Sequence, residues 1–515
     1  MLAIAESAVL VGLAAHPVRV EVSATRGIPS FEIVGLAEAT VRESRVRVKS
    51  ALAGLGIDIN EHRITINLAP ADLKKRGSAF DIAIALGTLV ALGRLPQEAI
   101  DGVLLLGELS LNGRLQALRG VVAHLLGAKS QATKRVVVPL ANATEAGLVD
   151  GIDVELAGSL EELVESLQGT KVLERPSRAE PEHAAPFVDD LADVRGQDCA
   201  RRALEVAAAG SHDLLMWGPP GAGKTMLARR LPGILPAMTR EEALEVTAIH
   251  GIAGLTKTIV GRRPFRAPHH TASDAALVGG GELVRPGEIS LAHNGVLFLD
   301  ELAEFRRSAL EALRQPLEDG FVSLARARGY SDYPARPLVI AATNPCPCGR
   351  YGDGTAACTC GPRVMLYRSR LSGPLLDRID VHTSLPKVDV LDLQSERAGE
   401  SSAAVRERVI RAREIQRARR ARGEVRVSTN ARLTQKEIAR VCALDAHGLS
   451  TLANAVRKHD LSARAYSKVL RVARTIADLA GATSIDAAHV AEALSYRMPF
   501  VAVQAEAQQP QAAAP

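Results

Sequence analysis

The chain has 515 residues, of which 47% are hydrophobic and 23% charged, and its formal net charge is +5. This length allows about three or four domains with buried cores, and so mild a charge predicts no particular partner. No run of about 18 apolar residues occurs, so we expect no membrane-spanning helix. Four of the six cysteines lie within residues 346–360. Such clustering disfavours a secreted fold with dispersed disulfides and favours a metal site in a reducing compartment.

The first sixteen residues, MLAIAESAVLVGLAAH, are apolar enough to resemble a secretory signal peptide. They lack a basic beginning, carry Glu6 inside the apolar run and continue into the strand-like sequence VRVEVSA. We therefore expect them to form part of the first domain, and we expect the protein to be cytoplasmic.

Residues 1–168 are predicted to form a first domain of α/β or α+β type. Strand-like runs are found at residues 18–24, 63–68, 102–109 and 135–139, and helices with apolar periodicity at residues 38–55 and 80–92. Residues 169–187 carry mixed charges, prolines and few large apolar side chains, which is typical of a linker.

Residues 188–388 are predicted to form a second α/β unit. The runs DLLMWG, GVLFLDE and PLVIAATN are short and apolar throughout, as expected of parallel strands buried on both faces. Residues 389–500 have an almost wholly helical pattern, and residues 501–515 are low in complexity, so we expect this tail to be disordered.

A P-loop follows the first of these strands. Its glycines let backbone N–H groups curl round phosphate oxygens, Lys224 reaches the β and γ phosphates, and the Thr225 hydroxyl binds Mg²⁺. The loop, GPPGAGKT, consists of Gly218, Pro219, Pro220, Gly221, Ala222, Gly223, Lys224 and Thr225. The motif in this strand–loop–helix setting predicts an ATP site with Mg²⁺.

Polar side chains end the other two strands. Asp300 and Glu301 follow VLFL, and the carboxyl ends of parallel strands are where α/β proteins bind ligands. We expect Asp300 to hold Mg²⁺, directly or through water, and Glu301 to polarise the attacking water. Asn344 ends the third strand, where its amide can orient that water against the γ-phosphate; the alternative is a turn-initiating asparagine before Pro345.

Residues 265–281, FRAPHHTASDAALVGGG, lie between the two halves of the predicted ATP site. Arg266, His269 and His270 offer donors to phosphate oxygens, so one interpretation is contact with a DNA backbone. The other is a structural cover beside the ATP site, because histidines are also common in interior hydrogen-bond networks.

A second candidate for DNA contact is FVSLARARGYSDYPAR, whose two strand-like runs flank Gly329 and predict a β-hairpin. At its tip Arg326 and Arg328 can contact phosphate, and Tyr330 can stack on a base. The alternative is a solvated hairpin edge.

The cysteines form two Cys-x-Cys pairs, Cys346 with Cys348 and Cys358 with Cys360. Two close pairs joined by a glycine-rich loop can wrap one tetrahedral Zn²⁺, although the spacing within each pair is shorter than usual. We expect a structural zinc that braces the strand ending at Asn344; free thiols or an iron–sulfur cluster are the alternatives.

Three arginine-bearing segments follow. Arg378, in LSGPLLDRID, can stabilise the transferring phosphoryl group of a neighbouring subunit, or it can pair with a nearby aspartate. Arg464 begins a predicted helix and can act as a second phosphate sensor, or it is an ordinary solvated arginine. Residues 406–426 carry nine arginines, which either bind DNA or another subunit or simply solvate a helix.

The order of these motifs, with RAPHHTASDAALVGGGELVRPGEISLAHNGVLFLDEL and NPCPCG, resembles the ComM/YifB family of Mg-chelatase-like AAA+ ATPases. The resemblance covers nearly the whole chain. It implies a multidomain α/β fold: an N-terminal ribosomal-S5/Lon-protease-like α+β domain, an AAA+ P-loop core with a helix-2 insert, and a C-terminal helical lid domain. In related proteins the insert forms a loop that faces a central pore.

The resemblance also implies a function. Members of the family resemble homo-hexameric DNA helicases that drive branch migration when DNA is integrated during natural transformation. We therefore expect an ATPase that acts on single-stranded, double-stranded or branched DNA, alone or with recombination proteins. The main alternative is a protein-remodelling ATPase like the Mg-chelatase subunit, and a less favoured one is an ATP-dependent protease.

The N-terminal domain resembles the Lon protease fold in KKRGSAFDIAIALGTLVALG and GELSLNGRLQALRGVVAHLLGA. Aligned on the Lon pattern, Ala79 rather than Ser78 takes the nucleophile position, and Val122 takes that of the lysine. A serine hydroxyl without an amine to accept its proton is a poor nucleophile. We therefore expect this domain to be inactive as a protease and to serve in binding or assembly.

Overall fold

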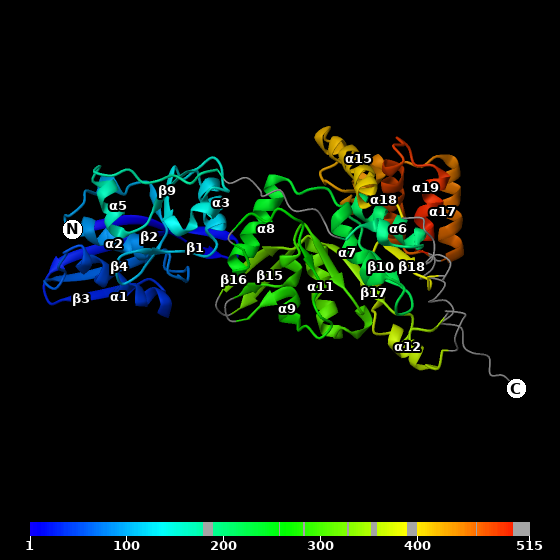
Figure 1. The fold of residues 1–515 in the computed structure, drawn as a ribbon, viewed down its shortest axis with the longest axis horizontal. Helices are drawn as coiled ribbons and strands as arrows, with labels where there is room; N and C mark the ends of the chain where they lie inside the picture. The colour runs from blue at the N-terminus through cyan, green and yellow to red at the C-terminus, as the bar shows by residue number, and fades with distance from the viewer. Residues whose placement is uncertain are drawn as a thin grey trace.

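The computed structural model describes residues 1–178, 189–256, 258–281, 284–326, 329–351, 358–388, 399–459 and 461–497. Three parts follow one another along the longest axis of the molecule, and Figure 1 shows them in chain order: an N-terminal region, a central core and a group of C-terminal helices. The chain is a multidomain α/β protein with a helical C-terminal region.

The N-terminal region is built on a mixed seven-stranded sheet with the order β3-β4-β2-β1-β5-β8-β9. The apolar start of the chain forms strand β1, which pairs antiparallel with β2 and parallel with β5. The strands are β1 (Leu2–Val11), β2 (Ala14–Arg26), β3 (Ser30–Val34), β4 (His62–Ala69), β5 (Val103–Leu105), β8 (Arg135–Pro139) and β9 (Asp153–Ala157). A separate small hairpin joins β6 (Glu108–Leu109) to β7 (Leu115–Gln116).

Helix α2 (Asp81–Ala91) is buried along its whole length against β1 and β2. Its Asp81 carboxylate accepts hydrogen bonds from Arg47 of α1 (Ala39–Gly54) and from the backbone N–H of Leu109. Burial raises the pKa of Asp81, and these two hydrogen bonds offset part of that rise. The remaining helices of this region are α3 (Val121–Ser130), α4 (Ala143–Ala146) and α5 (Leu160–Leu167).

The N-terminal region extends past the predicted boundary at residue 168. Leu173 is buried in its hydrophobic core, and Glu174 forms a bridge with Leu156 of β9. An apolar side chain and a backbone bridge thus attach this polar, proline-containing stretch to the sheet. The predicted linker residues 179–187 lie outside the described part of the chain.

The central core contains a parallel five-stranded sheet with the order β11-β14-β17-β10-β18. Alternate residues of β14 enter two different cores, since Phe298 packs with α6 and α7 while Leu299 packs with α11. Both faces are therefore covered, as the unbroken apolar runs predict. The strands are β10 (Leu214–Trp217), β11 (Phe265–Arg266), β14 (Val296–Leu299), β17 (Leu338–Thr343) and β18 (Val381–Ser384).

Helices and two small hairpins surround this sheet. The hairpin predicted around Gly329 is present as β15 (Phe321–Arg326) and β16 (Gly329–Pro334), and β12 (Gly279–Gly280) pairs with β13 (Arg285–Pro286). The helices are α6 (Asp198–Gly210), α7 (Lys224–Ile234), α8 (Arg240–Ala253), α9 (Asp274–Val278), α10 (Glu288–Leu291), α11 (Arg307–Asp319), α12 (Arg363–Arg368) and α13 (Gly373–Leu376).

Helix α8 joins the core to the N-terminal region. Its Ala248 is buried in the same hydrophobic cluster as Val121 and Leu125 of α3, and Leu244 and Ile252 pack against that cluster. Nearby, Arg240 donates to the backbone carbonyl of Leu148. The two parts thus share apolar side chains as well as a polar contact.

The C-terminal helices pack on the face of the core sheet that carries α6 and α7. They are α15 (Ser402–Ala421), α16 (Gln435–Val441), α17 (Ala446–His459), α18 (Ala463–Leu479) and α19 (Ala487–Ser495). In the arginine-rich helix α15, Arg413 donates to Ala208 and Arg419 pairs with buried Asp478, so these two arginines have structural partners. Of the helices in the described ranges, none combines the length and apolarity that crossing a membrane requires.

Candidate active site

The P-loop leaves strand β10, which lies between β17 and β18, and runs into the first turn of α7. Gly221 and Gly223 have φ values of +79° and +89°, a conformation that favours glycine, and they let the loop turn back on itself. Lys224 is buried, and its Nζ donates to the carbonyl oxygens of Gly218 at 2.7 Å and Pro219 at 2.9 Å. The loop thus encloses the ammonium group where phosphate oxygens are expected.

Strand β14 brings the two predicted carboxylates beside this loop. The Thr225 hydroxyl donates to Asp300 Oδ2 at 2.8 Å, so the two oxygens predicted to bind Mg²⁺ already lie together. Glu301 has φ +52°, a strained value for a residue other than glycine, and its N–H donates to Asp300 Oδ1. Burial lowers the pKa of Lys224, whereas the charges of Asp300 and Glu301 raise it.

Asn344 stands at the end of β17, and its side-chain oxygen accepts a hydrogen bond from Lys224 Nζ at 3.0 Å. The backbone of this strand also holds the P-loop, since Gly218 N–H donates to the Thr343 carbonyl at 3.2 Å. The three predicted strand ends therefore converge on Lys224, as the parallel sheet requires.

The segment 265–281 lies beside this site. A cavity of about 250 Å³ is lined by Thr225, Arg229, Ala267, Pro268, His269, His270, Phe298, Asp300 and Glu301. His270 Nδ1 is 3.2 Å from Glu301 Oε2, whereas His269 contacts Thr271. Arg266 makes a two-point ion pair with Glu288 at 2.6 and 2.7 Å. This is the arrangement expected of the cover interpretation, and Arg266 and His270 reach acidic partners within the chain.

The predicted contacts at the hairpin tip cannot be located. Arg328 and the side chains of Arg326 and Tyr330 lie outside the described part of the chain. The described base of the hairpin packs toward the N-terminal region, where β16 contacts β1.

Two residues near the site were not singled out from the sequence. Gln197 has φ +60°, and its Nε2 donates to the carbonyl oxygens of P-loop Ala222 at 3.3 Å and of Pro386 at 2.7 Å. Its Oε1 is buried and has no hydrogen-bond partner among the residues that the structure describes. Arg229 lies one turn after Thr225 on α7 and faces the same cavity. Arg229 could have been identified from the sequence, because it follows the P-loop threonine by four residues and so lies on the same helix face. The sequence contains no comparable signal for Gln197.

Arg378 and Arg464 lie on the opposite side of the sheet from the P-loop, where the amino ends of the parallel strands meet. We call this side the amino edge, and the side that carries the P-loop the carboxyl edge. Arg378 precedes β18, which runs parallel to β10, and the P-loop follows β10. A four-residue strand spans about 13 Å, so neither the P-loop nor Lys224 is within reach of Arg378 in the same chain. The cavity of about 640 Å³ that both arginines line shares no residue with the one beside Asp300.

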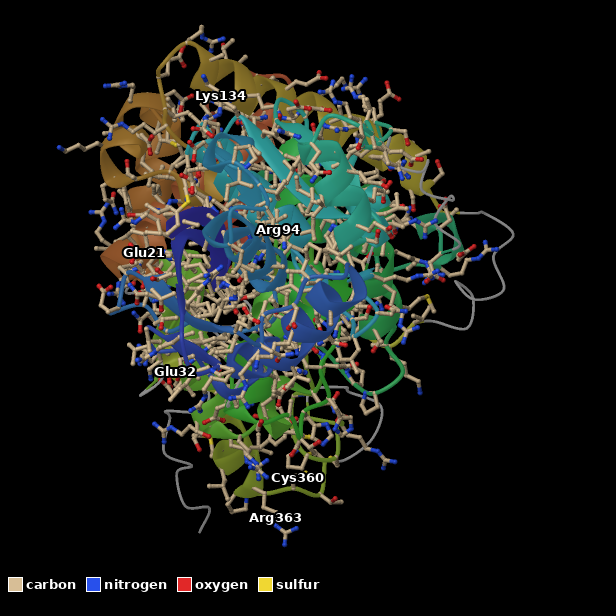
Figure 2. The ribbon with its side chains drawn as sticks, turned by 90° about the vertical axis from the view of Figure 1, so that its left-hand side faces the viewer. Glu21, Glu32, Arg94, Lys134, Cys360 and Arg363 are labelled. Atoms are coloured by element: carbon tan, nitrogen blue, oxygen red, sulfur yellow. The ribbon has the colours of Figure 1, made fainter. Side chains whose placement is uncertain are left out.

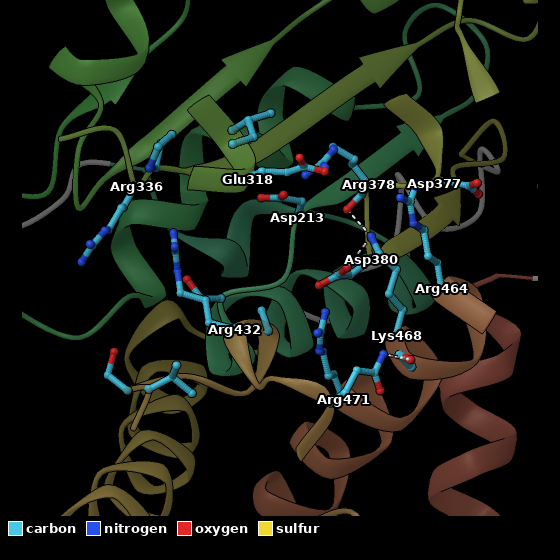
Figure 3. Close-up of a pocket in the computed structure, with 18 of the residues that line it drawn as sticks. Asp213, Glu318, Arg336, Asp377, Arg378, Asp380, Arg432, Arg464, Lys468 and Arg471 are labelled. Atoms are coloured by element: carbon cyan, nitrogen blue, oxygen red, sulfur yellow. Dashed lines mark hydrogen bonds and ion pairs between the residues drawn. The ribbon is translucent and has the colours of Figure 1, made fainter. Parts of the chain in front are cut away.

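This second cavity is strongly basic, and Figure 3 shows its charged side chains converging between the core and the C-terminal helices. Its positively charged residues are Arg336, Arg378, Arg420, Arg426, Arg432, Arg464, Lys468 and Arg471, and its acidic ones are Asp213, Glu318, Asp377 and Asp380. Arg378 contacts Glu318 of α11, a partner other than the predicted aspartates. Burial, followed by the positive charges of Arg314 and Arg464, lowers the pKa of Arg378.

A buried network fixes the floor of the basic cavity. Asp380 accepts from His212 at 2.8 Å and pairs with Lys468 of α18 at 2.7 Å, and Lys468 also donates to the Arg378 carbonyl. Beside it, burial and the charge of Asp380 raise the pKa of Asp213 to about 7. The helix that carries Arg464 is thereby attached to the segment that carries Arg378.

The four predicted metal ligands converge. The Sγ atoms of the four cysteines all lie within 4.8 Å of one another, and three of the separations are 3.4, 3.7 and 3.6 Å. Four sulfurs at 2.3 Å from a tetrahedral zinc would be about 3.8 Å apart, whereas a disulfide needs about 2 Å. The cluster therefore fits a tetrahedral metal. Figure 2 shows Cys360 and Arg363 at the margin of the molecule, away from the N-terminal sheet.

The protease-like position lies in a cavity of about 920 Å³ between the N-terminal region and the core. Ser78 donates to Glu108, Ala79 lines the cavity and Val122 is buried. Three lysines of this domain, Lys74, Lys75 and Lys129, carry the amine that Val122 lacks, but two of them bind elsewhere: Lys75 donates to Pro70 O and Lys129 to Asp150 O. The third, Lys74, lines the cavity itself.

Comparison with known proteins covers almost the whole chain. Residues 190–393 match the family described as magnesium chelatase, subunit ChlI; residues 20–142 match subunit ChlI of Mg-chelatase; residues 399–497 match the ChlI C-terminal family. The chain is 45% identical to the competence protein ComM of Haemophilus influenzae, over 96% of this chain and 97% of that protein. It is 44% identical to the uncharacterized protein YifB of Salmonella typhimurium, over 96% and 97% respectively. A shorter match, 26% identical over 165 residues, links 30% of this chain to 28% of Lon protease 2 of Bacillus subtilis.

Proposed function

The chain belongs to the ComM/YifB family of Mg-chelatase-like AAA+ ATPases, and on this premise we propose that it is a ring-forming, ATP-driven motor that moves branched DNA. The assembly is a homo-hexamer, and its task is branch migration during the integration of transforming DNA. One relative matched over 97% of its length is a competence protein, and this name supports the link to DNA uptake.

One observation supports the proposal that the chain assembles into a ring. The phosphate-binding groups and the two arginines lie at opposite edges of one sheet, in cavities that share no residue. A complete hydrolytic site then forms when the carboxyl edge of one copy meets the amino edge of the next. Such a head-to-tail contact is heterologous and closes into a ring when the rotation between copies permits.

Each residue has a defined task in hydrolysis. Thr225 and Asp300 would hold Mg²⁺, which would supply charge neutralisation for the phosphates, and Lys224 with the P-loop N–H groups binds the β and γ phosphates. Asn344 positions the attacking water, and Glu301 accepts its proton. Arg378 and Arg464 from the next copy stabilise the charge on the transferring phosphoryl group.

The segment 265–281 connects the substrate to this chemistry. His270 contacts Glu301, so a movement of the segment changes the position of the catalytic base. We assign Arg266, His269 and His270 to this coupling, and we keep direct phosphate contact for the hairpin tip with Arg326, Arg328 and Tyr330. DNA bound in the ring then releases Glu301 and raises turnover.

The test is ATP hydrolysis by the full chain with no DNA, with single-stranded DNA, with duplex and with a four-way junction. We expect stimulation that is strongest with the branched substrate, and ATP-dependent movement of the branch point in a strand-labelled junction. Absence of both effects would contradict the DNA motor.

The second candidate is an ATPase that remodels a partner protein, because the core matches the magnesium chelatase subunit ChlI family. It predicts hydrolysis that is insensitive to every DNA tested and increased by a partner polypeptide. A protease is disfavoured by buried Val122 at the position of the base, and it predicts peptide cleavage that Ser78→Ala abolishes.

A further inference from the structure

We propose that a zinc ion in the four-cysteine cluster clamps the P-loop, so that occupancy of the metal site sets the affinity for nucleotide. The inference rests on the ATP site alone and is independent of whether the motor acts on DNA. It gives the predicted zinc a task beyond local folding.

The cysteine segment begins at the catalytic strand. Cys346 follows Asn344 by two residues and is fully buried, and Gly349 N–H donates to the Cys346 carbonyl at 2.9 Å, which closes a tight turn. Arg368 of α12 donates to the Pro345 carbonyl at 3.1 Å and lies over the ring of Tyr351 at 4.6 Å. Both ends of the segment are therefore attached to the core.

The turn then packs directly on the P-loop. Gly349 has φ +75°, and a Cβ placed on it would lie 2.2 Å from Cδ and 2.7 Å from Cγ of Pro220. The obstacle is a proline ring, which cannot rotate away as a flexible side chain would. The absence of a side chain at position 349 lets the cysteine turn touch the apex of the loop that binds phosphate.

Three contacts now join the P-loop to β17 and its continuation. Gly218 N–H bonds to Thr343, Lys224 bonds to Asn344, and Pro220 lies against Gly349. The first two come from a regular strand, whereas the third comes from an irregular segment. Described thiol contacts within that segment are weak hydrogen bonds, so a metal that binds all four sulfurs would hold the third contact in place.

The first experiment measures metal and nucleotide on the same purified chain. We expect about one zinc ion per chain, as in a structural zinc site. Removal of the zinc by a chelator should weaken binding of a fluorescent ATP analogue, and added zinc should restore that binding. Cys348→Ser should lower zinc content and nucleotide affinity together, whereas Cys199→Ser, at an exposed cysteine outside the cluster, should change neither.

The second experiment separates the clamp from the stability of the metal site. Gly349→Ala should retain zinc but weaken nucleotide binding about tenfold, because the added methyl displaces Pro220. Gly423→Ala is the matched control: φ is +73°, nearly the same backbone strain, but no atom lies within 4 Å of the new methyl. Equal nucleotide affinity in the two glycine variants, a metal-free native chain, or iron in place of zinc would each overturn the proposal.

A failure of this inference is distinguishable from a failure of the proposed function. Nucleotide affinity is measured without DNA, so loss of the clamp leaves DNA-stimulated hydrolysis to be tested separately. Conversely, a chain that ignores DNA can still show zinc-dependent nucleotide binding.

Discussion

The two edges of the core sheet carry different parts of a hydrolytic site: phosphate-binding groups at one edge and arginines at the other. At the carboxyl edge Lys224, Thr225 and Asp300 already contact one another or the P-loop backbone, in the arrangement needed for phosphate and Mg²⁺. The amino edge gathers arginines around a cavity of about 640 Å³ that contains no phosphate-binding loop. This difference supports our proposal that one edge holds ATP and the other completes a second copy's site.

The largest effect is expected for Arg378→Ala, a substitution at the amino edge. Removal of an arginine that stabilises the transition state lowers phosphoryl transfer by about a thousandfold. We expect hydrolysis to fall by that order while equilibrium binding of ATP is unchanged. Arg370→Ala, which removes an arginine paired with Glu304, is the control and should retain activity. An equal loss in both variants would contradict the assignment.

The carboxyl edge is tested by Glu301→Gln. The amide keeps the size of the side chain but cannot accept the proton of water, so turnover should fall about a hundredfold with ATP still bound. Glu304→Gln changes a nearby glutamate that pairs with Arg370 and should behave like the native chain. Steady-state hydrolysis and nucleotide binding are measured on each protein, and normal turnover of Glu301→Gln would show another group to be the base.

A smaller effect is expected at the contact between the carboxyl edge and the covering segment. His270→Ala removes the neighbour of Glu301 and should raise DNA-free hydrolysis about threefold, the range expected for a partly exposed polar contact. His489→Ala is matched to it, because His489 of α19 pairs with Asp486 instead, away from the ATP site. Unchanged or reduced basal hydrolysis in His270→Ala would remove the proposed restraint on the base.

The smallest effect concerns Asp213 beneath the basic cavity. Its pKa is raised from 3.8 to about 7 in the folded chain, so its contribution to stability is full below pH 4 and is lost as pH rises through 7. Asp213→Asn does not titrate and should therefore gain thermal stability relative to the native chain between pH 5 and pH 8. Asp377→Asn, in the same cavity, is the control; a parallel pH dependence of all three proteins would contradict this prediction.

Local motifs could be predicted from the sequence where one short stretch carries both the element and its chemistry. GPPGAGKT, VLFLDE and VIAATN each include a buried strand or its end together with the polar residue that follows it. Asn344 was predicted to face the γ-phosphate that Lys224 binds, and because parallel strands end at one edge the two side chains lie together, at 3.0 Å. The clustering of the four cysteines was predictable because all four lie within one short stretch, residues 346–360.

Contacts between distant segments could not be predicted. The pair of His212 with Asp380 joins residues 168 positions apart, and Lys468 reaches Arg378 across 90 positions, without any shared local pattern. The packing of Gly349 on Pro220 depends on the paths of two loops, and the attachment of Leu173 to the first core depends on one apolar residue in a polar stretch. Such contacts follow from tertiary packing, which periodicity does not encode.

A mixture of two inactive variants tests the shared site most directly. Lys224→Ala lacks the phosphate-binding lysine but keeps Arg378, and Arg378→Ala has the opposite defect. If the arginine acts on a neighbouring copy, an equal mixture contains about a quarter of intact interfaces and should regain hydrolysis in that proportion. If the mixture stays as inactive as either variant alone while both proteins assemble together, the two edges do not form a common site and the account is contradicted.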